Sequence, residues 1–141
     1  MFVRTKSLIV GVSIAIVVFI AIAVVATIMR NYVDISFATE VSIRFHYGDK
    51  EIDVVVTDED DIRIIKESLK GISFRDYPAC GFSLDTSIKF TDGSKTIVLC
   101  PGCDACGSKA RIGDSDRYIH IKDWKALEAV LEKYGMTFPC I

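Results

Sequence analysis

The sequence predicts an α+β protein in which an N-terminal transmembrane helix precedes a two-layer domain, an antiparallel sheet with two helices on one face. Three observations support this fold class. Residues 8–29 carry no charge, several later segments alternate apolar and polar residues between tight-turn sequences, and two segments repeat apolar residues at helical spacing. The expected order after the membrane helix is ββαβββα.

The N-terminal apolar run spans 22 residues, 8–29, between Arg4 and Lys6 on one side and Arg30 on the other. About 20 apolar residues in a helix cross a hydrocarbon core of about 30 Å, so the run is long enough to span. A cleaved signal peptide is the alternative, but its apolar region usually has about 7 to 15 residues. The only cleavage-like sequence, Ala21-Ile22-Ala23, lies inside the run. We therefore expect an uncleaved membrane anchor.

The flanking charges predict the orientation of the anchor. Arg4, Lys6 and the free amine precede it, whereas Arg30 alone follows, and positive charge is retained on the cytoplasmic side. The expected localisation is the cell membrane, single-pass, with residues 31–141 outside. The expected organisation is a cytoplasmic tail at 1–7, the transmembrane helix at 8–29, a juxtamembrane linker at 30–39 and an extracytoplasmic domain at 40–141.

The charge balance restricts the partners of the exported part. Residues 31–141 contain 14 basic and 19 acidic residues, a net charge of −5. Binding to nucleic acid needs a basic stripe, and the sequence has none, so no nucleic-acid partner is expected. About 110 residues suffice for one hydrophobic core and are too few to predict two domains.

The first hairpin is predicted at residues 41–56. Apolar residues alternate along both halves, and Gly48-Asp49 suits a two-residue turn. That turn predicts a full register, which opposes Tyr47 to Lys50, Phe45 to Ile52, Ile43 to Val54 and Val41 to Val56.

A helix is predicted from Asp58 to about Lys70. Thr57, with Asp60 three residues later, resembles a capping box, and the acidic residues 58–60 suit the positive end of the helix dipole. A calcium site is not expected, because the ligand spacing and central glycine of a calcium loop are missing. The apolar stripe that faces the sheet is Ile62, Ile65 and Leu69, and Gly71 ends the helix.

An irregular loop is expected at 71–82, followed by a second hairpin around Asp92-Gly93, a type I′ turn sequence. The apolar face consists of Leu84, Thr86, Ile88, Phe90, Ile97 and Leu99. A two-residue turn opposes Ile88 to Ile97 and Thr86 to Leu99, and places Cys100 across from Asp85.

The rest of the chain predicts one more strand and a helix. A loop at 100–113 and a turn at 114–116 lead to a strand at Arg117–Ile121. Asp123 is a suitable N-cap for a helix at Trp124–Tyr134, and Gly135 ends it. The helix carries one apolar stripe, Trp124, Leu127, Leu131 and Tyr134.

All five cysteines lie after the anchor, and in an exported domain such cysteines usually form disulfides. The register of the second hairpin brings Cys80 level with Ala105, close to Cys103 and Cys106, so a bridge from Cys80 to one of them is expected. Cys140 is the natural second half-cystine, and one thiol is left over.

Two other chemistries remain open for these cysteines. Cys100-Pro101-Gly102-Cys103 has the spacing of thiol oxidoreductases, but those sites open a long helix after a strand of a βαβ unit. The alternative metal set is Cys80, Cys100, Cys103 and Cys106, which could hold zinc or an iron-sulfur cluster. The fourth cysteine of a ferredoxin pattern is replaced by Ala110.

The remaining residues predict no catalytic site. His46 and His120 are isolated histidines on strands, and Asp114 and Asp116 form a turn. No Ser-His-acid set, glycine-rich phosphate loop or His-Glu-x-x-His motif is present, so neither a catalytic residue nor a cofactor is expected. The aromatic residues that could line a binding surface, though such residues are usually core, are Tyr77, Phe82 and Trp124.

Three sequence motifs carry a resemblance that covers about residues 40–141. They are Cys80-Gly81-Phe82, Cys103-Asp104-Ala105-Cys106, and Tyr134-Gly135 with the ending Phe138-Pro139-Cys140-Ile141. In these the chain resembles small, uncharacterised exported or membrane-anchored domains of Gram-positive bacteria. The resemblance implies export but no activity, and Cys100, an extra cysteine beyond the pattern, is the implied unpaired thiol.

Together these observations predict a membrane-anchored, disulfide-stabilised domain that binds a protein or small molecule at the cell surface without catalysis. The alternative is a membrane-tethered thiol or metal protein that uses Cys100, Cys103 and Cys106. The sequence does not name the partner.

Overall fold

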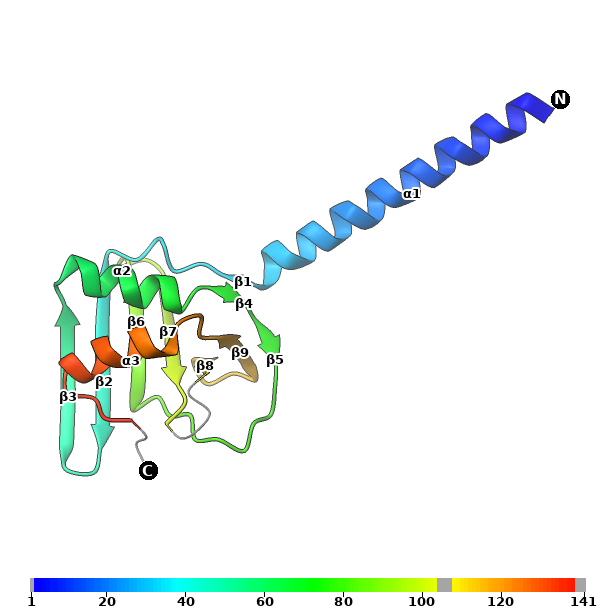
Figure 1. Ribbon diagram of the computed structural model, residues 1–141. Coiled ribbons are helices and arrows are strands. Elements are labelled where there is room, and N and C mark those ends of the chain that lie inside the picture. Colours follow the sequence, from blue (N-terminus) through cyan, green and yellow to red (C-terminus); the bar gives the residue numbers. More distant parts are fainter. Residues whose placement is uncertain (1, 104–107, 139–141) are drawn as a thin grey trace. The chain divides into compact units, whose positions relative to one another are not determined.

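The computed structural model describes residues 2–103 and 108–138 and confirms the α+β class. The chain divides into two compact units, Met1–Tyr32 and Val33–Ile141. The first unit is the helix α1, Phe2–Asn31, which is shown in blue in Figure 1. Its segment Val12–Asn31 is long and apolar enough to cross a membrane, and the apolar side chains of that segment are exposed, for example Phe19 at 73%.

The second unit contains a seven-stranded antiparallel sheet in the order β3-β2-β6-β7-β8-β9-β5. Its strands are β2 Glu40–Tyr47, β3 Lys50–Val56, β5 Phe74–Arg75, β6 Thr86–Thr91, β7 Thr96–Pro101, β8 Lys109–Ile112 and β9 Arg117–His120. The short strands β1 Tyr32–Val33 and β4 Gly71–Ile72 lie outside this sheet. The helices α2, Glu59–Ser68, and α3, Trp124–Lys133, lie on one face of the sheet, as predicted (Figure 1).

The first hairpin has the predicted register in full. Tyr47 is opposite Lys50, Phe45 is opposite Ile52, and the pairing continues to Val41 and Val56. Gly48 has a φ of +60°, a value that glycine adopts without strain. Turn chemistry and apolar pattern therefore specify the same pairing here.

The predicted register of the second hairpin is wrong by two residues. Ile88 lies opposite Leu99 instead of Ile97, because Ser94 and Lys95 belong to the turn together with Asp92-Gly93. Asp92 Oδ1 accepts hydrogen bonds from the backbone N–H of Ser94 at 2.9 Å and of Lys95 at 2.7 Å, which stabilises the longer turn. A shift of two residues leaves every side chain on its predicted face.

Two segments that were predicted to be loops contain strands. Residues 71–82 include β4 and β5, and residues 100–113 include β8. These strands have two to four residues, too few to show a clear alternating pattern. Their pairing depends on neighbours distant in sequence, such as Phe74 opposite Tyr118.

The helix caps agree with the prediction for α3 and differ for α2. Asp123 caps α3 by accepting a hydrogen bond from Ala126 N–H at 3.0 Å. The N-cap of α2 is Asp58 instead of Thr57, since its carboxylate accepts hydrogen bonds from the backbone N–H groups of Asp60 and Asp61. The helix ends at Ser68, two residues before the predicted end at about Lys70.

The core lies between the sheet and the two helices. Its largest fully buried side chains are Ile35, Ile43, Phe45, Ile65, Leu69, Ile88, Phe90, Leu99, Ile119, Leu127, Leu131 and Met136. Val33, Ile35 and Ala38 also belong to this core, although they lie in the segment expected to be a linker. The folded domain therefore begins at Val33, two residues after the end of α1.

A partly exposed ion pair joins the two helices on this face, because Asp61 is buried whereas the Lys133 side chain is 55% exposed. Asp61 on α2 is 6% exposed and accepts hydrogen bonds from Lys133 Nζ at 2.6 Å and from the Tyr134 hydroxyl at 2.8 Å. The hydrogen bond to Asp61 raises the pKa of Lys133. A buried carboxylate costs free energy unless it is paired. The hydrogen bonds from Lys133 and Tyr134 offset that cost for Asp61 between α2 and α3.

Candidate binding site

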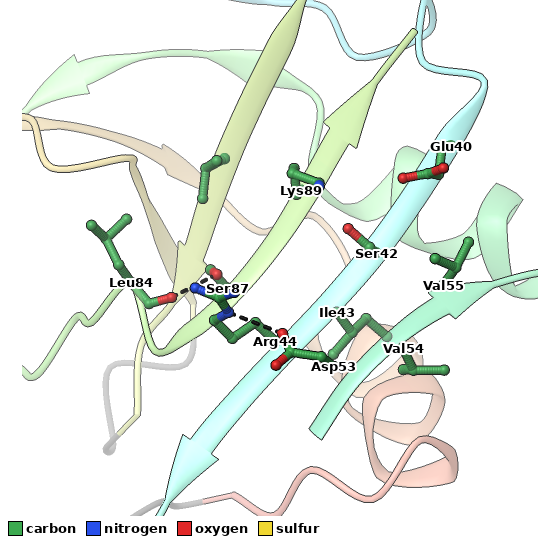
Figure 2. Close-up of a pocket in the computed structure, with 11 residues that line it drawn as sticks. Glu40, Ser42, Ile43, Arg44, Asp53, Val54, Val55, Leu84, Ser87 and Lys89 are labelled. Atoms are coloured by element: carbon green, nitrogen blue, oxygen red, sulfur yellow. Dashed lines mark hydrogen bonds and ion pairs between the residues drawn. The ribbon is translucent and has the colours of Figure 1, made fainter. Parts of the chain in front are cut away.

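The face of the sheet opposite the helices carries the polar side chains of the strands. Because side chains alternate along a strand, Ser42, Arg44 and His46 point away from the core that Val41 and Ile43 enter. A pocket of about 400 Å³ lies on this open face (Figure 2). It is lined by Glu40, Ser42, Ile43, Arg44, Asp53, Val54, Val55, Leu84, Ser87, Lys89 and Val98.

An ion-paired cluster borders the pocket on β2 and β3. Arg44 and Asp53 are directly opposite in the hairpin, and Arg44 Nε lies 3.0 Å from Asp53 Oδ1 (Figure 2). His46 Nε2 lies 2.6 Å from the other carboxylate oxygen. The hydrogen bonds from Arg44 and then His46 lower the pKa of Asp53, so this carboxylate is ionised at neutral pH.

The neighbouring part of the pocket presents polar groups from β2 and β6. Lys89 lies opposite Ser42, and Ser87 lies opposite Arg44, so the two cations occupy diagonal positions. The Ser87 hydroxyl donates a hydrogen bond to the Leu84 carbonyl at 2.7 Å. Within residues 2–103 and 108–138, neither Lys89 nor Glu40 makes an ion pair. Both groups are therefore open to a partner.

Apolar side chains complete the pocket. Val55 is 50% exposed and Leu84 is 45% exposed, and Val98 lies opposite Lys89 on β7. The surface thus combines charged groups of both signs with apolar contacts, the mixture typical of recognition surfaces. No motif in the sequence marks Arg44, Asp53 or Lys89 as site residues. The predicted register of the first hairpin implies that Arg44 lies opposite Asp53. That pairing was the signal in the sequence that could have pointed to this ion pair.

The structure corrects one predicted half-cystine. Cys103 carries a free thiol and is 8% exposed as part of the core, so it does not bridge to Cys80. Cys100 is also free, as the resemblance implied. The other two predicted half-cystines, Cys106 and Cys140, lie outside the described residues.

The predicted proximity of Cys80 to the loop after β7 is supported. The backbone N–H of Cys103 donates a hydrogen bond to the carbonyl of Gly81, the residue after Cys80, at 3.0 Å. The two-residue error in the hairpin register did not separate these segments. Strand pairing therefore brings the chain around Cys80 to the mouth of the cysteine-rich loop.

Cys100 lacks the lowered pKa that a catalytic thiol needs. It is fully buried on β7 opposite Arg111, and its Sγ lies 3.8 Å from the Gly113 carbonyl. Burial raises the pKa of Cys100 to about 11, and the favourable charge of Arg111 does not compensate. With this pKa Cys100 is protonated at neutral pH, and a protonated thiol is a poor nucleophile in thiol exchange.

The described residues contain no group of three or more His, Cys, Asp or Glu side chains that could hold a metal ion. The alternative metal set includes Cys106, which lies outside them. The two histidines are far apart: His46 is on β2 and His120 on β9, with β6, β7 and β8 between them. His120 stacks on Phe74, with ring centroids 4.5 Å apart.

The three aromatic candidates do not form one surface patch. Tyr77 is 83% exposed, whereas Phe82 packs against Tyr118 with ring centroids 5.1 Å apart. Trp124 packs edge-on against Phe138 at the same centroid distance and supports the core.

No family model, curated protein or solved structure matches the chain.

Proposed function

We propose that this chain is a single-pass membrane protein that displays a binding domain on the extracytoplasmic side. The N-terminal helix α1 supports the anchor, because its apolar side chains are exposed along Val12–Asn31 and a lipid environment would remove them from water. Arg4 and Lys6 support a cytoplasmic N-terminus. The alternative role of the same segment is that of a signal sequence that is cleaved after export.

The open-face pocket is the observation that carries the binding proposal. It offers a free ammonium group on Lys89, the Arg44–Asp53 pair and the apolar side chains of Val55 and Val98. A protein or small molecule with both polar and apolar groups fits this surface. The proposal is non-enzymatic, because the buried and protonated Cys100 does not supply a thiolate.

A disulfide from Cys80 to Cys106 or Cys140 is part of the proposal. Cys80 is not among the free thiols of the described residues, and its neighbour Gly81 is hydrogen-bonded to Cys103. A bridge to Cys106 closes a loop of about 25 residues and stabilises the fold by roughly 3 kcal/mol. Peptide mapping of the unreduced protein identifies the pair. A Cys80 joined to neither residue contradicts this part.

The alternative thiol function is tested by reactivity. Folded full-length protein is treated with iodoacetamide at pH 8, before and after unfolding. We expect Cys100 and Cys103 to react only after unfolding, because both are buried. Rapid modification of Cys100 in the folded protein would favour the thiol enzyme instead.

Membrane topology tests the proposal directly. Cys100 and Cys103 are buried, and whichever of Cys106 and Cys140 the peptide map shows to be unpaired is replaced by Ser. In that background an exposed thiol is introduced by Glu132→Cys on α3, and Ser7→Cys in the N-terminal tail is the matched control. Intact cells are treated with a membrane-impermeant maleimide. We expect Glu132→Cys to be labelled and Ser7→Cys to be labelled only after lysis. The opposite pattern contradicts the proposed orientation, and a mature chain that lacks α1 contradicts the anchor.

A further inference from the structure

Among the described residues, no strand covers the outer edge of β3, which is the longer of the two sheet edges. The two edge strands are β3 and β5, and β5 has only two residues whereas β3 has seven. Natural edge strands are usually protected by charged side chains, by proline, by a bulge, by shortness or by a covering segment. The charged side chains of β3 are Lys50, Glu51 and Asp53. The strand β3 contains no proline, and its pairing with β2 continues without interruption from Lys50 to Val56.

The register shows which backbone groups of β3 face outward. The two-residue turn makes Tyr47 and Lys50 a hydrogen-bonded pair, so the next pair, His46 and Glu51, exchanges no hydrogen bonds. In agreement, His46 N–H points away from β3 and donates to the Asp85 carbonyl at 2.8 Å. The backbone groups of Glu51, Asp53 and Val55 therefore face the outer edge.

No described strand pairs with that edge, and its three outward residues carry side chains on the open face. Glu51 is exposed and makes no ion pair within the described part of the chain. Asp53 and Val55 line the open-face pocket. The edge thus offers unpaired backbone groups beside two acidic side chains and one apolar side chain.

The acidic side chains at the edge of β3 distinguish between two partners for that edge, a second copy of this chain and a basic polypeptide segment. In a symmetric antiparallel pairing of two copies that uses all three outward residues, Asp53 lies opposite Asp53. Like charges directly opposite one another destabilise a sheet. A second copy is therefore disfavoured. A segment with basic side chains gains a favourable contact with Glu51, which makes no ion pair within the described residues, and shares the Asp53 carboxylate with Arg44 and His46.

We propose that β3 binds an extended polypeptide segment that has Lys or Arg at alternate positions and adds to the sheet as a further strand. Its backbone pairs with Glu51, Asp53 and Val55, and its basic side chains lie beside the two carboxylates. This names the partner class of the binding domain proposed above and rests on that function. It does not depend on the orientation of the anchor.

The test uses the full chain in phosphatidylcholine nanodiscs and a fluorescent peptide, acetyl-Thr-Lys-Val-Lys-Val-Lys-Thr-amide. The matched control peptide has Glu in place of each Lys. We expect the Lys peptide to bind about tenfold more tightly, and to slow hydrogen exchange at the amides of Glu51, Asp53 and Val55. Equal binding of the two peptides, or binding without slower exchange at these amides, overturns the proposal.

Three variants separate edge pairing from general attraction. Glu51→Lys should weaken peptide binding about fivefold. Glu67→Lys is the same charge change at an exposed position on α2, beside the end of β9 and away from β3, and should leave binding unchanged. Val55→Pro removes one outward N–H and no bond to β2, and should weaken binding about tenfold. Equal effects of the two Lys variants, or parental affinity in a folded Val55→Pro protein, contradict the proposal.

A peptide methylated at alternate backbone nitrogens provides the same test if Val55→Pro lowers the melting temperature. It keeps the charges and loses its own donors, so it should bind about tenfold more weakly than the parent peptide. Undiminished binding of this peptide overturns edge pairing. Such a failure leaves the cysteine-labelling result unchanged, so the two proposals fail separately.

Discussion

The two faces of the sheet carry different kinds of interaction. The covered face packs Val41, Ile43 and Phe45 of β2 against the helices, and these side chains are at most 1% exposed. On the same strand, Ser42 and Arg44 face the open side, where Arg44 and Asp53 are both more than half exposed. Burial of apolar surface dominates stability, whereas exposed ion pairs contribute little. The covered face therefore holds the fold, and the open face is available for binding.

The largest effect is expected from the covered face. Phe45→Ala leaves a cavity beneath the helices and should lower the free energy of unfolding by about 3 to 5 kcal/mol. Ser42→Ala on the same strand is the matched open-face control and should change it by less than about 0.5 kcal/mol. Urea unfolding of both full-length variants provides the comparison. Equal losses would show that the two faces do not differ.

A smaller effect is expected from the partly exposed ion pair through which the buried Asp61 joins α2 to α3. Asp61→Ala removes the acceptor of Lys133 and Tyr134 and should cost about 1 to 3 kcal/mol. Asp60→Ala, one residue earlier, removes only an exposed ion pair with Arg63 and should cost at most about 1 kcal/mol. Urea unfolding again provides the measurement. A larger loss for Asp60→Ala would contradict the assignment.

The N-cap of α2 predicts a still smaller, pH-dependent effect. Hydrogen bonding from the backbone of Asp61 lowers the pKa of Asp58 below its ordinary value. The folded state therefore favours the ionised form, so this contribution is present above the ordinary pKa and is lost as pH falls through the lowered value. Asn also caps helices but does not titrate. The melting temperature of Asp58→Asn should consequently fall less between pH 7 and pH 3 than the melting temperature of the parent protein.

The comparison of the two hairpins shows what the sequence could predict. In the first, Gly48-Asp49 and the apolar pattern specify one register, and the structure has it. In the second, the apolar pattern allows a shift of two residues, and the Asp92 side chain stabilises the longer turn. A side-chain hydrogen bond inside a turn leaves no periodic pattern in the sequence, so turn length was the uncertain quantity.

The candidate site was only partly predictable for a related reason. Its residues are ordinary surface types, and Arg44, Asp53 and Lys89 become neighbours only when β2, β3 and β6 are placed side by side. The cysteines were the candidate functional residues in the sequence, yet Cys100 and Cys103 are buried and free. Burial and strand order, which depend on the whole domain, decided which residues form a surface.

The open face should contribute little to folding, which leaves it free for a partner. The most direct measurement is urea unfolding of the full-length double variant Arg44→Gln and Lys89→Gln, which removes both cations of the pocket and keeps most of each side chain. We expect the free energy of unfolding of this double variant to lie within about 1 kcal/mol of that of the parent protein. A loss comparable to that of Phe45→Ala would show that the open face holds the fold, and would contradict the account.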